Sequence, residues 1–524
     1  MNLQDKIRKY INVRRFVIIY AISVLLFIVF ITNELTNTFD GMWHGSFNYA
    51  GTWEIRCGRF VWPFVTIARL GFCPEPFTTL CALAIFLISA ELILYTLEVK
   101  DGFKAYLIEI YIICNTTILN MLSYRFMSIT FAFAFLCSVI SVITIKKKGL
   151  NSIIATGFFM VLTLGLYQAQ IGCTLLIIAA IIIKMLSGKC KCKEIIQLIL
   201  KTIVTFILSG FVYKLLWFLA MNILKLESTS YNGASDVSLI GIIKRLPERI
   251  LYTYKVTNIY FFDNAYKFNI FQRFHGVVGA IIIVICIYAF YNIISDILRS
   301  NSENSIKIVL TRSFLSVVLL ALMPILTNIA CILAPESGTM IQQLLGVSLI
   351  PAILMTFISN DDAHNKCLFC DKFDKIVIFI FAFVLYGNIV MISVDQHTML
   401  QGRRTTINLF NRIEFALEND GYDLNKKVII AGIPSDNPTF AKDKVWNYSN
   451  DYARYGQLWT GGDSAYHSFT GVFRDTGTNL TYETDDNYYN KLLESDDVKN
   501  MPVYPAKDSI REIDGHIVVK VSNQ

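Results

Sequence analysis

Long runs without any charged residue are the feature that most limits how this chain can fold. Six of them have the length of a single helix and lie at residues 16–33, 126–145, 274–295, 313–335, 337–360 and 376–394. A helix needs about 20 mostly apolar residues to cross the hydrocarbon core of a bilayer, because it rises about 1.5 Å per residue. The sequence therefore predicts a polytopic membrane protein, with further spans near residues 76–98, 104–123 and 195–222.

A longer uncharged run covers residues 149–183, and its 35 residues exceed the length of one span. The polar residues Tyr167, Gln168 and Gln170 in its middle predict two helices joined by a tight turn. The expected total is then eleven spanning helices. The first span follows a basic segment, as a signal peptide does, but no small-residue cleavage site follows it, so we interpret it as an anchor.

Basic loop residues indicate the orientation. With the N-terminus inside, the predicted cytoplasmic segments hold 20 Lys and Arg residues. The short outer loops hold 4, namely Arg56, Arg59, Arg69 and Arg125, and a longer outer loop at about 223–273 holds 7 more. This asymmetry follows the positive-inside rule, and an odd number of spans then places the C-terminal part outside. Residues 1–394 carry a net charge of +12 and residues 395–524 carry −5, so the overall +7 belongs to membrane loops and indicates no nucleic-acid partner.

Two parts are therefore expected: an all-α polytopic membrane domain at 1–394 and a small extracytoplasmic α/β domain at 395–524. In the second part, a helical pattern at 403–417 precedes the apolar run 426–434, which predicts a buried strand, and residues 515–521 predict another. Six aromatic residues could stack on sugars or simply fill the core of this domain. They are Trp446, Tyr448, Tyr452, Tyr455, Trp459 and Tyr466.

Polar residues gather at the predicted outer ends of the spans. The first outer loop, residues 34–71, contains Asp40, His44, Trp53, Glu54, Arg56 and Arg59. The turn after the third span adds Tyr124 and Arg125, and the turn inside the long uncharged run adds Tyr167 and Gln168. Because all these loops face the same solvent, they predict one site. Its expected substrate-binding residues are His44, Trp53, Glu54, Tyr124, Tyr167 and Gln168.

Group transfer on that face needs a donor that brings its own activation, and a lipid-phosphate sugar meets this condition. Its phosphate leaves as an anion and needs cations, a role that suits Arg59 and Arg125, because guanidinium groups hold phosphate oxygens with two hydrogen bonds. Lys214, in the outer half of its span, is a further candidate for the lipid phosphate. Asp40 is the candidate general base for the acceptor hydroxyl, although a loop carboxylate can also be a solvated turn residue.

Cofactor signals are weak. The chain has no Gly-x-Gly-x-x-Gly, Walker A or Asp-x-Asp pattern, which disfavours a nucleotide-dependent enzyme. His44 lies four residues after Asp40, which would suit a metal on a helix, but Gly41 and Gly45 weaken a helix there. No metal is therefore expected, with a divalent ion left as the alternative.

The cysteines leave two alternatives open. Cys57 and Cys73 share the first outer loop and could pair. Cys190, Cys192, Cys367 and Cys370 offer the four thiols of a zinc site, although reduced thiols are the simpler interpretation.

Other charged groups have blander explanations. Glu91, Glu109 and Lys201 fall near the cytoplasmic ends of their spans, where snorkelling or local pairing explains them. Residues 223–273 form a predicted outer loop that combines basic and aromatic residues, which favours an anchor at the lipid headgroups over a lid above the substrate.

The first outer loop also resembles a known family. Its run FDGMWHGSFNYAGTWEIRCGRFVWPF, with Asp40, Trp53, Gly58 and Arg59, is similar to the opening pattern of the bacterial type II glucosyltransferases of O-antigen and cell-wall glycans. Tyr167-Gln168, MLQGRRTTINLFNRIEFAL at 399–417 and MPVYPAKDSIREIDGHIVVKVS near the end extend the similarity. Many relatives have two adjacent acidic residues where this chain has Phe39-Asp40, which puts any role for a carboxylate pair in doubt.

The resemblance implies a GT-C-like enzyme in the bacterial cytoplasmic membrane, with Asp40 near the reaction centre. It would transfer a hexose, glucose by the family name, from undecaprenyl phosphate to a surface glycan outside the membrane. Its partners would be this lipid donor, the glycan acceptor and membrane lipid. A transporter or flippase of lipid-linked sugar, and a non-catalytic assembly partner, are the alternatives.

Overall fold

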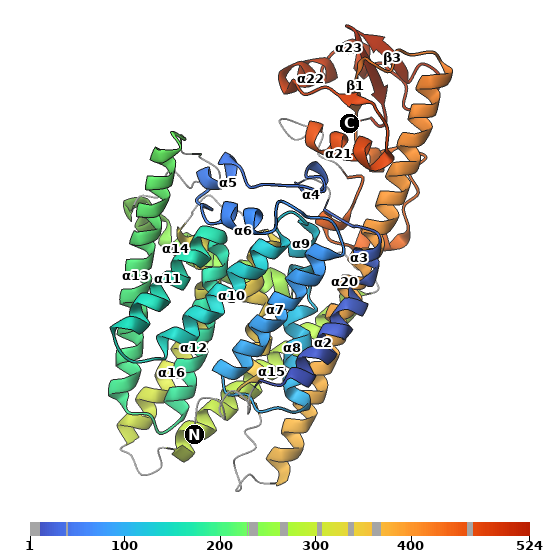
Figure 1. The fold of residues 1–524 in the computed structure, drawn as a ribbon. Coiled ribbons are helices and arrows are strands. Elements are labelled where there is room, and N and C mark those ends of the chain that lie inside the picture. Colours follow the sequence, from blue (N-terminus) through green and yellow to red (C-terminus); the bar gives the residue numbers. More distant parts are fainter. Residues whose placement is uncertain are drawn as a thin grey trace.

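The computed structural model describes residues 11–37, 40–227, 229, 239–262, 271–300, 306–333, 340–358, 368–457 and 465–523. A bundle of long helices forms the first part, and a small sheet with short helices lies beyond one end of it (Figure 1). We call this end of the bundle the domain end. The protein is thus a mostly helical membrane protein with a small C-terminal α/β region, as the sequence predicts.

The described first half of the bundle consists of thirteen short and long helices, of which α2 (Val13–Leu26) is the first. They are α2, α3 (Ile28–Thr32), α4 (Asp40–Trp43), α5 (Thr52–Arg56), α6 (Trp62–Ala68), α7 (Phe77–Thr96), α8 (Phe103–Ile113), α9 (Thr116–Ser123), α10 (Ser128–Ile145), α11 (Leu150–Leu166), η1 (Gln168–Gln170), α12 (Ile171–Ser187) and α13 (Cys192–Ile223). The second half comprises α14 (Leu239–Phe261), α15 (Phe271–Ser300), α16 (Ile306–Thr327), α17 (Ile329–Leu333), η3 (Ile341–Gln343), α18 (Leu345–Ser348), α19 (Ile350–Met355) and α20 (Leu368–Asn419).

Within the described residues, seven helices are long and apolar enough to cross a membrane, or eight if α8 and α9, bent by 42° at their junction, form one span. The predicted count of eleven is not confirmed. Residues 16–33 break at Phe27 into α2 and α3. The described part of 337–360 consists of η3, α18 and α19, and every residue of α18 and α19 is buried. Packing in the interior of the bundle therefore explains why this run is apolar, and the run does not form one straight membrane span.

The long uncharged run folds as predicted. Helix α11 ends at Leu166, Tyr167 adopts an extended conformation, and η1 turns the chain into α12. Two antiparallel helices thus replace the single run of 35 residues.

The predicted outer loop at 223–273 is different. Its described part contains α14, a helix of 23 residues with Pro247 inside it. Tyr254 Oη donates a hydrogen bond to the Ala321 carbonyl in α16 at 2.6 Å, and Phe261 is buried. The segment is therefore a helix that packs against the bundle. The periodicity of this basic and aromatic stretch did not indicate the helix. Asp236, an acidic residue of this predicted loop, lies outside the described residues.

Charged side chains pair at the end of the bundle opposite the domain end. Arg15 is fully buried, and its guanidinium bonds Glu91 Oε2 at 2.6 Å and Glu109 Oε2 at 3.0 Å. Lys201 Nζ donates to the carbonyls of Ile145 and Lys147 at 2.8 and 2.6 Å. The prediction of local pairing for Glu91, Glu109 and Lys201 is confirmed.

Helix α20 joins the two parts as one element of 52 residues (Figure 1). It contains both the predicted span at 376–394 and the predicted helix at 403–417, so residue 395 lies within a continuous helix. Beyond it, a mixed sheet has the strand order β2 (Thr481–Tyr482), β1 (Lys427–Ala431), β4 (His516–Lys520), β3 (Ile510–Ile513). β1 is parallel to both neighbours, with Val428 opposite Ile517, and β3 is antiparallel to β4.

Short helices surround the sheet. They are η4 (Pro434–Asp436), η5 (Lys444–Tyr448), η6 (Asp451–Ala453), α21 (Ala465–Thr476), α22 (Asp486–Leu493) and α23 (Asp496–Lys499). Both predicted strands are confirmed. Of the aromatic residues proposed for glycan stacking, Trp446 and Tyr455 are buried in the protein, and Tyr452 Oη donates to Asp395 at 2.7 Å. Trp459 and the side chain of Tyr466 lie outside the described residues.

The described cysteines are free thiols. Cys57 and Cys73 are both buried and unpaired, so the disulfide alternative is wrong for this structure. Cys190 and Cys192 are also free, while Cys367 and the side chain of Cys370 lie outside the described residues. No group of three or more potential metal ligands occurs among the described residues.

Candidate active site at the domain end

The first outer loop folds into α4, α5 and α6, which lie across the domain end of the bundle (Figure 1). Glu54 caps the start of α5, because its Oε2 accepts a hydrogen bond from the Gly51 backbone N–H at 2.7 Å. Glu54 is buried in this role. Its carboxylate therefore holds the loop, and a substrate would have to compete with this cap.

Asp40 is the first residue of α4. Burial raises the pKa of its carboxyl to about 6, although the nearby positive charge of Arg59 lowers it and the negative charge of Glu54 raises it further. Among the residues that the structure describes, none donates a hydrogen bond to this carboxylate. The oxygens of Asp40 are thus available, as a general base requires, and the charge of Arg59 acts on this carboxyl.

Arg59 is held by aromatic rings. Its guanidinium carbon lies 5.4 Å from the ring centroid of Trp62 and 5.3 Å from that of Tyr167. The Arg59 Nε and the Trp62 Nε1 are buried, and neither has a hydrogen-bond partner within the described part of the chain. Because buried donors normally find acceptors, this cluster is suited to an anion that brings oxygen atoms.

The residue before Arg59 must be glycine. Gly58 has a φ of +84°, and a Cβ atom there would lie 2.2 Å from the Tyr213 hydroxyl oxygen. Gln168 Nε2 donates to the Cys57 carbonyl at 2.8 Å and to Tyr213 Oη at 3.0 Å. The predicted residue Gln168 therefore braces the loop against α13, and Tyr167 forms a wall of the arginine site.

Lys214 follows Tyr213 on α13 and points to the outside of the bundle. Its ammonium nitrogen lies 4.3 Å from the ring centroid of Trp217, whose Nε1 donates to the Ile55 carbonyl at 2.7 Å. The exposed side chains around it include Phe211, Leu215 and Phe218. Lys214 is thus a cation on an apolar surface next to the loop that carries Arg59.

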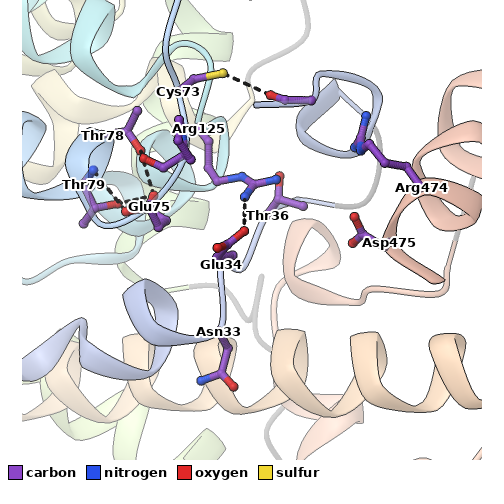
Figure 2. A network of polar contacts seen from close by, with 12 residues as sticks. Asn33, Glu34, Thr36, Cys73, Glu75, Thr78, Thr79, Arg125, Arg474 and Asp475 are labelled. Carbon is purple, nitrogen blue, oxygen red and sulfur yellow. Dashed lines mark hydrogen bonds and ion pairs between the residues drawn. The ribbon is translucent and has the colours of Figure 1, made fainter. Parts of the chain in front are cut away.

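Arg125 is placed differently from the prediction. Its Nη1 lies 3.5 Å from Glu34 Oε2, and its side chain extends toward Glu34 in Figure 2. Glu75 itself accepts hydrogen bonds from the hydroxyls of Thr78 and Thr79 at 2.9 and 2.7 Å. Among the described residues, Arg125 thus contacts an acidic side chain, whereas Arg59 lies between aromatic rings.

His44 and Asp40 do not share a helical face, because α4 ends at Trp43. The His44 Nδ1 lies 2.6 Å from Asn48 Nδ2, and its ring centroid lies 3.9 Å from that of Phe126. Burial lowers the pKa of His44 to about 4, with smaller electrostatic contributions from His467, Arg474 and Arg69. His44 is therefore a neutral, packed imidazole, and the spacing that would suit a metal is not formed.

Trp53, Tyr124 and Gln342 complete the site. Trp53 is about half exposed on α5. Tyr124 Oη accepts a hydrogen bond from Gln342 Nε2 at 3.2 Å. Sequence reasoning missed Gln342 and Trp62, although the pair Gln342-Gln343 interrupts an apolar run and Trp62 closely follows Arg59, which are the signals that could have found them.

The fold and the site define an integral-membrane protein with a polar, arginine-containing site at one end of its helical bundle. The family model described as glucosyl transferase GtrII matches residues 46–345, more than half of the chain, and the chain belongs to this family. No match was found among curated proteins, and none among solved structures. The family assignment identifies a membrane glucosyltransferase. The matched range includes Arg59, Tyr167 and Lys214, whereas Asp40 and the C-terminal domain lie outside it.

Proposed function

We propose that this protein transfers glucose from a polyprenyl-phosphate donor, undecaprenyl phosphate in bacteria, to a surface glycan on the outer face of the cytoplasmic membrane. The observation that carries the proposal is an available carboxylate, Asp40, within the electrostatic reach of a half-buried, aromatic-flanked cation, Arg59. A glycosyl phosphate needs both groups at once: a base for the attacking hydroxyl and a cation for the departing phosphate.

The reaction balances with these two residues. The acceptor oxygen forms a bond to the anomeric carbon of glucose while the bond from that carbon to the phosphate oxygen breaks. The hydroxyl proton passes to Asp40, and the electron pair leaves with the lipid phosphate, whose charge Arg59 stabilises. With a pKa of about 6, Asp40 is mostly ionised at neutral pH and yet more basic than an ordinary carboxylate.

The donor lipid would approach from the membrane side. Lys214 lies on the apolar outer surface of α13 and is one residue from Tyr213, which contacts the Arg59 loop. We infer that Lys214 first meets the lipid phosphate and that Arg59 holds it during transfer. Arg125, which contacts Glu34, is the weaker candidate for this role.

Sugar contact falls to the remaining residues of the site. Trp53 presents a half-exposed ring on which a pyranose could stack, and Tyr124 offers a hydroxyl. Glu54, His44 and Gln168 would act by holding the loop in place. The proposed mechanism needs no metal ion. In the proposed orientation, the domain end faces outward and the N-terminus lies in the cytoplasm.

A donor-choice experiment tests this function. Purified protein in detergent-permeabilised proteoliposomes receives labelled polyprenyl-phosphate glucose or labelled nucleotide-linked glucose, together with crude surface glycan. Transfer of label to glycan from the lipid donor alone is the expected result. Transfer from the nucleotide sugar would contradict the donor assignment. In sealed vesicles, movement of intact lipid-linked glucose across the bilayer without cleavage would favour a flippase.

A further inference from the structure

The helix that carries Asp40 is too short to maintain itself. α4 has four residues, a single turn, and an isolated turn fixes several backbone angles for hardly any hydrogen bond. The position of Asp40 must therefore be imposed by whatever packs against α4. The structure shows contacts from two sides.

One side is the helical bundle. The Asn37 N–H and the Thr36 hydroxyl both donate to the Ser123 carbonyl at the end of α9, at 3.1 and 2.9 Å. The Gly41 N–H donates to Asn37 Oδ1 at 2.7 Å. These bonds hold the start of α4 against the bundle.

The other side is the C-terminal domain. From α21, Arg474 donates to the carbonyls of Met42 and Trp43, the latter at 3.2 Å. Gly471 packs so closely that an added Cβ would lie 2.6 Å from the Met42 carbonyl oxygen. The ring centroids of His467 and Trp43 are 4.1 Å apart. A cation at the last carbonyls of a helix is the favourable arrangement with its dipole.

α21 is itself anchored next to Arg474. Asp475 accepts hydrogen bonds from Arg403 Nε at 3.2 Å and from Tyr455 Oη at 3.0 Å. Arg403 Nη1 also donates to the Asn33 carbonyl at 2.9 Å, just after α3. Figure 2 shows Arg474 and Asp475 on α21 beside the segment that begins at Asn33. The two ends of residues 33–43 are thus tied to the same part of the C-terminal domain and α20.

We propose that the C-terminal domain completes the active site by positioning Asp40, with Arg474 as the positioning residue that holds α4 in place. This inference rests on the proposed role of Asp40 as the base. Arg474 touches neither the carboxylate nor the reacting atoms. It acts by donating hydrogen bonds to the Met42 and Trp43 carbonyls. Through these contacts the C-terminal domain contributes to the transfer reaction.

The test compares Arg474→Ala and Arg474→Lys with Arg511→Ala, which removes an exposed arginine of the same domain whose Nε donates to the Asp508 carbonyl of its own loop. Arg474→Ala should lower kcat about 10- to 100-fold, the scale of a misplaced catalytic group, and should leave the donor KM nearly unchanged. Arg474→Lys should recover part of the rate, because one donor remains. Arg511→Ala should behave as the wild type.

The pH profile separates positioning from general damage. The groups that act on Asp40 are Arg59 and Glu54, and burial sets its raised pKa. When α4 loosens, water reaches the carboxylate, so the acid limb of the kcat profile should move below pH 6 in Arg474→Ala. A merely less stable enzyme would keep its acid limb. An unchanged kcat or an unmoved limb would overturn the inference.

Hydrogen exchange gives a readout that does not depend on activity. The backbone amides of residues 40–43 should exchange faster in Arg474→Ala than in the wild type, whereas Arg511→Ala should leave their exchange unchanged. Equal exchange in all three proteins would overturn the positioning contact. Full activity of Asp40→Asn would instead refute the proposed base. An inactive Asp40→Asn with a normal Arg474→Ala would refute only the positioning role.

Discussion

Replacing Asp40 with asparagine should make the protein more stable while it removes activity. The pKa of Asp40 is raised from its ordinary value of 3.8 to about 6, chiefly by burial. A group with a raised pKa in the folded state supports the fold below pH 3.8, and this support is lost as the pH rises through 6. At neutral pH, ionised Asp40 therefore costs about 3 kcal/mol as an upper limit, at 1.36 kcal/mol per pH unit.

Asparagine resembles the neutral acid and avoids this cost. Asp40→Asn should stabilise the protein by at most about 3 kcal/mol at pH 7.5 and by at most about 1 kcal/mol at pH 4.5. Thermal unfolding in one detergent at both pH values measures this difference. Asp451→Asn, whose side chain is 90% exposed, is the matched control and should change little at either pH. A pH-independent effect of Asp40→Asn, or a loss of stability at pH 7.5, would refute the reasoning.

Three further perturbations probe the site and the bundle. Arg59→Lys should raise the donor KM about 10-fold or more in steady-state assays, because an ammonium cannot grip two phosphate oxygens; an unchanged KM argues against a phosphate site. Gly58→Ala should lose about 1–3 kcal/mol more stability in thermal melts than Gly421→Ala. Both glycines have positive φ, but only the first added methyl meets a neighbour, the Tyr213 hydroxyl. Arg15→Ala should cost about 3–5 kcal/mol, since two buried carboxylates lose their cation; a melt that is barely shifted would mean that these carboxylates are neutral.

The pattern of apolar runs was enough to predict a membrane bundle and the pair α11 and α12, because lipid-spanning helices must satisfy their backbone groups internally and be apolar throughout. The same pattern could not distinguish lipid-facing from interior segments. Residues 345–355 are as apolar as a span but are enclosed by other helices. Conversely, the charged and aromatic composition of α14 concealed a helix.

Site residues that share one loop could be predicted from the sequence. Contacts between distant segments of the chain could not, because they depend on the tertiary fold. Asp40 and Arg59 both belong to the loop that the sequence singles out, and the positive charge of Arg59 acts on the Asp40 carboxyl. Arg125 forms an ion pair with Glu34, a contact that the sequence did not indicate. The contact of Arg474 with α4 joins residues more than 400 positions apart. No local pattern could have indicated it.

The most direct test is a single-turnover measurement of purified wild-type protein and Asp40→Asn with labelled polyprenyl-phosphate glucose and glycan, with Asp451→Asn as the control. The account predicts transfer by the wild type and the control, and a loss of about 100-fold or more in Asp40→Asn, the scale of removing a general base. Equal rates of transfer in all three proteins would contradict it.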